Sequence, residues 1–259
     1  MNYKTILLND SGPVRTIILH RPDRRNAMTP EMQMELIAAL EETARSGCRI
    51  LVLSGSGPAF CSGLDLSALK EMQGAAAAEY RSDAERIARL FLALYELPIP
   101  TIAAVHGPAI AGGAGLAILC DFTLATPDAK FGFTEVRIGF VPALVSVFLS
   151  LQIGDKRSRD LLLTGRILDA NEACKMGLVN EVVPREDLSQ RVESLAQSLL
   201  ANSLEALSAT KRMITARHRA WLDAAIADAI EVSTQIRKTG DFREGISAFL
   251  EKRKPTWGK

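Results

Sequence analysis

The stretch from Ile102 to Glu135 constrains the fold more than any other part of this 259-residue sequence. It begins as a short apolar strand, turns through a glycine-rich corner, continues as an apolar helix and returns to a strand. The corner contains Gly107, Gly112, Gly113 and Gly115. Glycine adopts positive φ without strain and lets another molecule approach the backbone closely. The pattern predicts a strand–corner–helix–strand unit whose free helix N–H groups face the space in front of Gly112.

A second glycine-rich corner, Ser54–Leu66, also follows an apolar strand. Backbone N–H groups that converge from two such corners on one carbonyl oxygen stabilise the negative charge that develops there. A single corner of this kind is more often only a tight turn. Two of them, both placed after apolar strands, favour an oxyanion-binding site.

Charge and cysteine usage exclude several classes of protein. The 31 basic and 30 acidic residues give a net charge of +1, so no net field attracts nucleic acid or a membrane surface. The four cysteines form no C-x-x-C pair, which predicts free thiols in a reducing compartment. No signal peptide is visible, and prolines and glycines interrupt the uncharged stretch Leu97–Cys120. We therefore expect a soluble, cytoplasmic protein that neither spans a membrane nor binds nucleic acid.

Apolar periodicity predicts alternating strands and helices in the first half of the chain. We expect a β-hairpin, a helix capped by Thr29, a buried strand and an amphipathic helix, over Tyr3–Leu8 with Val14–Leu19, Thr29–Ser46, Ile50–Leu53 and Ser82–Leu94. Strands that alternate with helices in this way are typical of parallel βαβ units in an α/β fold.

The character of the chain changes after Gly139, where helical patterns predominate. Pro184 interrupts this part, and the residues after it form three or four amphipathic helical patterns. We therefore predict an αβ core over residues 1–184 and a helical module over residues 185–259.

Glu135 is the strongest candidate for chemistry, because a carboxylate at a strand end beside an oxyanion site is placed for proton transfer. A surface Glu135 paired with Arg137 is the structural alternative. Ser54 and Ser62 lack a convincing His–Asp pair, and G-x-S-x-G, G-x-x-x-x-G-K-[ST] and H-E-x-x-H are absent. The sequence therefore indicates neither a serine hydrolase, a P-loop protein nor a metal site.

Other charged residues have structural interpretations first. We expect Asp65 to cap the following helix and Asp121 to accept hydrogen bonds at a helix end. The basic runs Lys211–Arg219 and Lys252–Lys254 are either solvated faces or contacts for a phosphate-rich ligand.

Five segments stand in order along nearly the whole chain: LHRPDRRNAMTPEM, SGSGPAFCSGLDL, AAVHGPAIAGGAGLAILCDFTLATPDAKFGFTEVRIGFVP, LLLTGRILDANEACKMGLVNEVVP and FLEKRKPTW. Together they resemble the enoyl-CoA hydratase/isomerase family, also called crotonases. The resemblance implies a crotonase-like spiral of ββα turns, followed by a C-terminal helical module that forms trimers, often paired into hexamers. It also implies an acyl-CoA thioester substrate and no cofactor other than the coenzyme A within that substrate.

Carried over position by position, the resemblance assigns an oxyanion hole to the backbone N–H groups of Leu64 and Gly112 and the acid–base role to Glu135. The coenzyme A contacts that it implies fall on Arg24, Arg25, Ala27, Ser62, Asp65, Leu66, Gly113, Phe249 and Lys252. We expect the acyl pocket to be lined by Leu66–Tyr80 and Phe140–Val147.

Gly115 departs from the family's pattern, because hydratases of this family typically carry a second glutamate there. Hydration of a 2-enoyl-CoA is the usual reaction, but one glutamate is enough to move a double bond from the 3- to the 2-position. A non-catalytic scaffold that binds acyl-CoA or RNA is a third interpretation, against which the retained Glu135 and the low net charge argue. We expect an enoyl-CoA hydratase first, with the isomerase as the alternative that Gly115 keeps open, and the sequence does not determine the acyl chain length.

Overall fold

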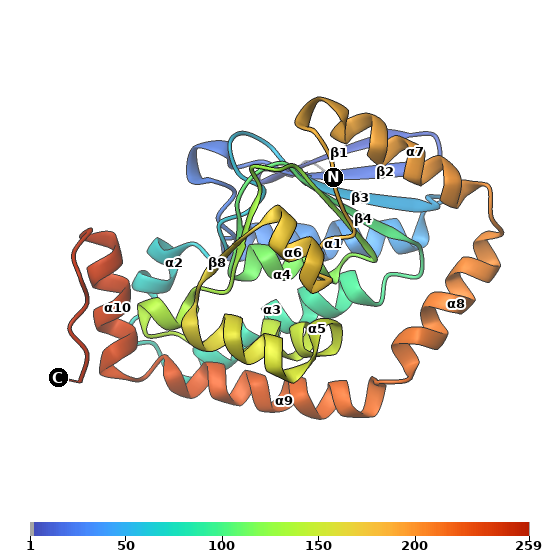
Figure 1. The fold of residues 1–259 in the computed structure, drawn as a ribbon. Helices are drawn as coiled ribbons and strands as arrows, with labels where there is room; N and C mark the ends of the chain where they lie inside the picture. The colour runs from blue at the N-terminus through green and yellow to red at the C-terminus, as the bar shows by residue number, and fades with distance from the viewer. Residues whose placement is uncertain (1–2, 259) are drawn as a thin grey trace.

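Two β-sheets organise residues 3–258, the part of the chain described by this computed structural model (Figure 1). The larger sheet has the strand order β1-β2-β3-β4-β6-β9, formed by Ile6–Ser11, Val14–Leu19, Ile50–Gly55, Thr101–Val105, Phe122–Ala125 and Glu181–Val182. The smaller sheet has the order β5-β7-β8, formed by Ala109–Ile110, Lys130–Gly132 and Ile167–Asp169. β1 and β2 pair antiparallel, and the other neighbours in the larger sheet pair in parallel. The predicted hairpin is confirmed, although its first strand spans Ile6–Ser11 instead of Tyr3–Leu8. The predicted parallel units are also confirmed.

The chain follows a spiral path, because successive strands alternate between the larger and the smaller sheet. β4 is followed by β5, and β6 by β7, so a strand of the larger sheet leads directly into one of the smaller sheet. Isolated bridges between Met28 and Leu64 and between Cys61 and Ala109 continue this arrangement toward the N-terminus. β5 and β8 are three residues long or shorter, which leaves too few positions for an alternating pattern that the sequence could reveal.

Ten α-helices and three short 3₁₀ turns are present among the described residues. The helices are α1 Pro30–Arg45, α2 Leu66–Glu71, α3 Ala77–Tyr95, α4 Gly112–Leu119, α5 Ala143–Thr164, α6 Ala170–Met176, α7 Leu188–Leu200, α8 Leu204–Ala216, α9 Arg219–Ile236 and α10 Gly240–Leu250. The 3₁₀ turns are η1 Pro22–Arg24, η2 Glu135–Ile138 and η3 Arg185–Asp187.

The ends of two helices test the capping arguments. Thr29 caps α1 as predicted, because its hydroxyl accepts a hydrogen bond from the Met32 N–H at 3.2 Å. α3 begins at Ala77, five residues before the predicted Ser82. The alanine-rich segment has high helix propensity, and the Glu79 carboxylate accepts a hydrogen bond from the Ala76 N–H at 3.3 Å.

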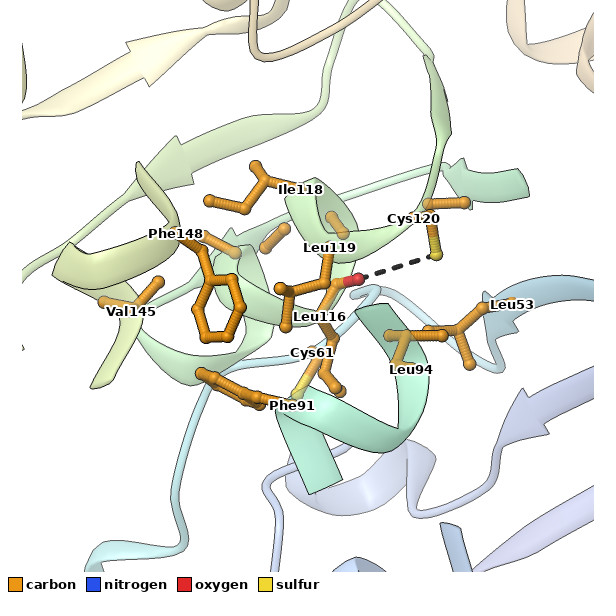
Figure 2. Packing of buried hydrophobic residues seen from close by; sticks show 14 of the residues in the cluster. Leu53, Cys61, Phe91, Leu94, Leu116, Ile118, Leu119, Cys120, Val145 and Phe148 are labelled. Carbon is orange, nitrogen blue, oxygen red and sulfur yellow. Dashed lines mark hydrogen bonds between the residues drawn. The ribbon is translucent and has the colours of Figure 1, made fainter. Parts of the chain in front are cut away.

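The apolar helix α4 forms the centre of the core, enclosed by α3 and α5 (Figure 2). Phe91 of α3 meets Phe148 of α5 edge to face, with ring centres 6.2 Å apart. Offset aromatic contacts of this kind add to the stabilisation from burial. All four cysteines are free thiols, as predicted, and Cys48, Cys61 and Cys120 are buried.

The helices after Pro184 pack on the core in different places. α7 covers the outer face of the larger sheet through Leu188, Val192 and Ala196. Figure 1 shows α9 running along α3 and α5, while α10 lies against α2 and η2. α8 joins α7 to α9, and none of its residues is buried within the described chain. Whether this part mediates oligomerisation stays a prediction.

Two cations of the basic run on α8 and α9 form ion pairs with acidic residues. Lys211 pairs with Asp121 at 2.7 Å and also donates to the Ile99 carbonyl at 3.1 Å. Arg219 pairs with Glu96 and Asp223. These cations hold the C-terminal helices to the core, which favours the structural interpretation over a phosphate-rich ligand. No helix among residues 3–258 is both long enough and apolar enough to cross a membrane.

Candidate active site

A cavity of about 500 Å³ opens between α2, α3, α5, η2 and α10. Both glycine-rich corners reach it, through Ser62 and Leu64 on one side and Ile110, Ala111 and Gly112 on the other. A cleft of this size, with apolar walls and a few polar groups, is typical of a small-molecule site.

Backbone strain at Ala111 sets the direction in which α4 begins. Ala111 has φ 54° and ψ −126°, a conformation that favours glycine, and its N–H donates to the Gly132 carbonyl at 2.6 Å. Such a residue costs on the order of 1–3 kcal/mol and persists only where its surroundings hold it in place. Gly112 is the first residue of α4, so its N–H has no acceptor within the helix. No other acceptor in the described chain takes a hydrogen bond from this N–H.

The second corner leaves an equivalent donor at Leu64. Met28 donates to the Gly63 carbonyl at 2.7 Å and accepts from the Asp65 N–H at 3.0 Å, which fixes the backbone on both sides of Leu64. The Leu64 N–H itself has no acceptor among residues 3–258. A Cβ atom on Gly63 would lie 3.5 Å from the Gly112 nitrogen and 2.9 Å from the Ala111 Cβ. The two corners are therefore in van der Waals contact at the cavity wall.

Glu135 is buried at this wall, with 8% of its surface exposed. Its Oε2 atom has no hydrogen-bond partner in the described part of the chain. Burial raises the pKa of the Glu135 carboxyl to about 7, because loss of water disfavours the charged form. A carboxyl that titrates near neutral pH can both take and return a proton.

Two details of the expectations for Glu135 are wrong. The residue does not close the strand β7, which ends at Gly132, but begins the 3₁₀ turn η2. It forms no ion pair with Arg137 in the described structure, and Arg137 instead lines the cavity as an exposed side chain.

The turn that carries Glu135 is held tightly by α10. A Cβ atom on Gly139 would lie 2.3 Å from the Asp241 carbonyl oxygen, and one on Gly245 would lie 2.1 Å from that of Ile138. Only glycine permits this approach of two backbones. The C-terminal helix α10 thus fixes the position of η2 and of the carboxyl group on it.

Apolar side chains surround Gly115, so this position provides no second carboxylate beside Glu135. A Cβ atom on Gly115 would lie 2.9 Å from Cζ of Phe91 and 3.1 Å from Cγ2 of Val145, and both side chains line the cavity. The space beside Gly115 is filled by hydrocarbon. Among the described residues that line the cavity, Glu135 is the only carboxylate.

The structure gathers most of the predicted site residues. The cavity is lined by Glu135, Leu64, Gly112, Arg25, Ser62, Leu66 and Phe249. It is not lined by Arg24, Ala27, Asp65, Gly113 or Lys252, and the predicted roles of all twelve residues remain predictions. The expected pocket segments contribute Leu66 and Leu69 on one side and Phe140–Val145 on the other.

Asp65 and Gly113 have clear structural roles. Asp65 caps α2 as predicted, by accepting from the Ser67 N–H at 3.0 Å, and it pairs with Arg21 at 2.9 Å. Gly113 packs so closely on Cys61 that a Cβ atom would lie 2.2 Å from the Cys61 carbonyl oxygen. It therefore brings the two corners together without lining the cavity.

Sequence reasoning missed four polar lining residues: Thr134, Arg137 as a cavity residue, Ser233 of α9, and Arg253, which was noted only within the basic run Lys252–Lys254. Thr134 and Arg137 flank Glu135 along the chain, so proximity to the candidate was an available signal. Ser233 lies far from every motif, and no pattern pointed to it. Groups of three or more metal-ligating side chains are absent from residues 3–258.

Comparison with known proteins finds relatives over nearly the whole chain. The family described as "Enoyl-CoA hydratase/isomerase" matches residues 9–259. The chain is 42% identical over 247 residues to a Thermus thermophilus protein that carries an enoyl-CoA hydratase name, with 95% of this chain and 98% of that protein covered. It is 31% identical to the crotonyl-CoA hydratase of Syntrophomonas wolfei, with 98% of both covered.

Solved structures agree on the fold. An enoyl-CoA hydratase/isomerase from Xanthobacter autotrophicus superposes with a TM-score of 0.89 at 31% identity, covering 97% of this chain and 98% of that one. An enoyl-CoA hydratase from Mycobacterium avium subsp. paratuberculosis superposes with a TM-score of 0.90 at 27% identity over the full length of both chains. The predicted spiral fold with C-terminal helices is confirmed.

Proposed function

Because the chain belongs to the enoyl-CoA hydratase/isomerase family and is an enzyme of that type, we propose that Glu135 transfers protons on an enoyl-CoA thioester. The observation that carries the proposal is a single buried carboxyl, with a pKa raised to about 7, in a cavity that two free backbone N–H donors also line.

The N–H groups of Leu64 and Gly112 hold the thioester oxygen in this proposal. When a proton leaves the carbon beside the thioester, negative charge moves onto that oxygen to give an enolate. Donors already oriented toward that position stabilise the charge without reorganising during the reaction. The strained Ala111 and the contact between the two corners support this placement.

The geometry supports isomerisation best. Glu135 removes a proton from C2 of a 3-enoyl-CoA, and the electron pair spreads over a dienolate whose oxygen carries the charge. Glu135 then returns the proton to C4, which leaves the double bond between C2 and C3. One carboxylate is enough for these steps, and the apolar contact of Gly115 with Phe91 and Val145 supplies no second one.

Hydration of a 2-enoyl-CoA is the second candidate, because the names of the relatives favour it. Here Glu135 takes a proton from water while the oxygen of that water bonds to C3. The enolate then receives a proton at C2 from the same carboxyl. With one carboxylate, the attacking water has fewer groups to orient it, so we expect this reaction to be the slower of the two.

Paired assays on the purified protein test the proposal. Crotonyl-CoA reports hydration, and 3-hexenoyl-CoA reports isomerisation. Isomerisation that is faster than hydration supports the single-carboxylate mechanism, and the reverse order supports hydration as the main activity. Binding of both thioesters without turnover of either would leave a non-catalytic scaffold and contradict the proposal.

Coenzyme A and subunit contacts complete the proposal. We expect the predicted contacts in residues 24–27 and 62–66 and at Gly113, Phe249 and Lys252 to hold coenzyme A at the cavity mouth, with no further cofactor. We also expect a homotrimer or hexamer, since α8 exposes Met213 and Ile214 and α9 exposes Trp221. The mass of the protein in solution tests the assembly.

The pH dependence of catalysis should follow Glu135. The first step needs the carboxylate, and burial raises its pKa to about 7. We therefore expect kcat/KM for isomerisation to fall tenfold per pH unit below an apparent pKa near 7 and to level off above it. A pH–rate profile measures this, and a profile that is flat between pH 5 and 8 would contradict the assignment.

Filling the position of Gly115 should destabilise the protein unless Phe91 is made smaller. In Gly115→Glu the new Cβ overlaps Phe91 Cζ, and overpacking of this kind typically costs about 1–3 kcal/mol. We expect a lower Tm for Gly115→Glu, and higher hydratase activity for Gly115→Glu/Phe91→Ala than for Phe91→Ala alone. An unchanged Tm in the single variant would show that Phe91 does not fill this space.

A further inference from the structure

A buried arginine that the proposed mechanism does not use lies next to the cavity. Arg237, the residue that follows α9 as its C-cap, is 1% exposed. Its Nη1 atom donates to Oδ2 of Asp83, from α3, at 2.7 Å. Its Nε and Nη2 atoms are buried and have no partner among residues 3–258. A buried donor without an acceptor costs free energy, so these N–H groups require a partner.

Asp83 is shared between two arginines. It uses one oxygen for Arg237 and the other for Arg86. Arg86 also donates to the neutral side chain of Gln33, at 2.8 Å, and keeps 22% of its side chain exposed, so water solvates its charge. Arg237 keeps only 1% of its side chain exposed, so its remaining N–H groups depend on acceptors other than bulk water. A guanidinium binds a charged acceptor more strongly than a neutral one, so an anion is the partner that fits these groups best.

The cluster of Asp83, Arg86 and Arg237 adjoins the end of the cavity formed by α3, α5 and α9. Cζ of Arg237 lies 5.3 Å from the centre of the Phe140 ring, and Phe140 lines the cavity. Ser233 lies four residues before Arg237, and because Arg237 keeps the helical backbone conformation at the end of α9, the two side chains lie on the same face. Ser233 also lines the cavity and is buried, and its hydroxyl forms no hydrogen bond within the described chain. Ser233 and Phe140 are therefore the parts of the cavity wall that border Arg237, which does not itself line the cavity.

The unpaired atoms of Arg237 match one kind of anion. The Nε–H and one Nη2–H of a guanidinium point in the same direction, as a fork that binds both oxygens of a carboxylate. Nearby, the Nε2 atom of Gln73 is also buried without a partner, and its neighbour Gly74 donates to the hydroxyl of Tyr80. The ring of Tyr80 lies 6.0 Å from Cζ of Arg237. The unpaired side-chain nitrogens of this cluster are donors, which fits an acceptor anion.

We propose that the acyl group of the substrate carries a second carboxylate at its far end, bound by Nε and Nη2 of Arg237 with the Ser233 hydroxyl beside it. The substrate class is then the mono-CoA thioesters of unsaturated dicarboxylic acids. This inference rests on the proposed function for the reaction, but the binding site itself can be tested without turnover.

Saturated thioesters, which the proposed reaction does not consume, provide the test. Isothermal titration at pH 8 compares succinyl-, glutaryl- and adipoyl-CoA with butyryl-, pentanoyl- and hexanoyl-CoA. Because charge-assisted hydrogen bonds are strong, we expect one length of the dicarboxylic series to bind about 10- to 100-fold more tightly than its monocarboxylic counterpart. Equal affinities at every length would overturn the proposal and leave water as the partner of Arg237.

Substitutions test whether the preference for dicarboxylic thioesters depends on Arg237. Arg237→Met should remove the preference for dicarboxylic thioesters. Arg237→Lys should largely remove it, because a lysine keeps the charge and the contact with Asp83 but lacks the fork. Arg243→Met removes the same charge from an exposed position on α10 and should keep the preference. If Arg237→Met fails to fold, Arg237→Lys carries the test, and a preference that persists in Arg237→Lys would overturn the proposal.

The outcomes separate this inference from the proposed function. Tight binding of a dicarboxylic thioester that depends on Arg237, without turnover of any enoyl-CoA, would confirm the anion site and contradict the reaction. Turnover of crotonyl- or 3-hexenoyl-CoA without a preference for dicarboxylic thioesters would support the reaction and overturn the anion site.

Discussion

Glu135→Gln should lower kcat for isomerisation by about 10²–10⁴-fold, the usual contribution of a positioned acid–base group. Glutamine keeps the size of the side chain but can neither take nor return a proton. Because the substrate contacts are otherwise retained, the Kd for butyryl-CoA should change by less than about threefold. Steady-state kinetics and titration with butyryl-CoA measure the two quantities. A variant that keeps a tenth of the wild-type kcat would contradict the role of Glu135.

The same variant has an expected result that does not depend on turnover. The pKa of Glu135 is raised from an ordinary 4.5 to about 7 in the folded chain, so the folded state binds more protons than the unfolded state between these values. The free energy of unfolding therefore falls as pH rises through this window, by roughly 3 kcal/mol for this group. Glutamine does not titrate, so the free energy of unfolding of Glu135→Gln should lack this decrease.

Denaturation at several pH values checks this linkage. Relative to the wild type, Glu135→Gln should gain about 3 kcal/mol of stability between pH 4 and pH 9, with most of the change between pH 5 and 7. Arg137→Gln serves as a matched control, because the structure contains no ion pair between Arg137 and Glu135. If Arg137→Gln shifts the titration of Glu135 by a full pH unit, the two side chains interact after all.

Local rules predicted the parts of the fold that depend on neighbours in sequence. The hairpin, the cap at Thr29 and the parallel strands follow from apolar alternation, capping chemistry and helix length, and the structure contains all of them. The same rules missed β8, because three residues are too few to show an alternating pattern. They also placed the start of α3 five residues too late, because the alanine-rich segment has no periodic apolar residues that would mark it as a helix.

The site was predictable only as far as the backbone reveals it. The glycines of the two corners and the nearby Glu135 mark the site in the sequence. The features that define its chemistry depend on contacts between distant segments. Phe91 fills the space beside Gly115, and α10 holds η2 through Gly139 and Gly245. The unpartnered Nε and Nη2 atoms of Arg237 likewise cannot be recognised until α9 packs on α3.

Loss of one backbone donor should slow the reaction almost as strongly as loss of the acid–base group. Leu64→Pro deletes the Leu64 N–H, which serves no other acceptor in the described chain, so no internal hydrogen bond is lost. The preceding residue is Gly63, which has no Cβ to clash with the proline ring. Removing one donor of an oxyanion hole costs about 10²–10³ in kcat, so we expect a decrease of this size in Leu64→Pro.

Leu64→Ala is the matched control for this prediction, because it shortens the same side chain but keeps the N–H. We expect Leu64→Ala to lie within about tenfold of the wild type, since it removes only part of the cavity wall. Thermal unfolding and butyryl-CoA titration establish that both variants fold and bind. The oxyanion assignment requires that Leu64→Pro fall well below Leu64→Ala in kcat. If the two variants have equal kcat, the Leu64 N–H does not touch the developing charge, and the donor opposite Gly112 has to be sought elsewhere on the cavity wall.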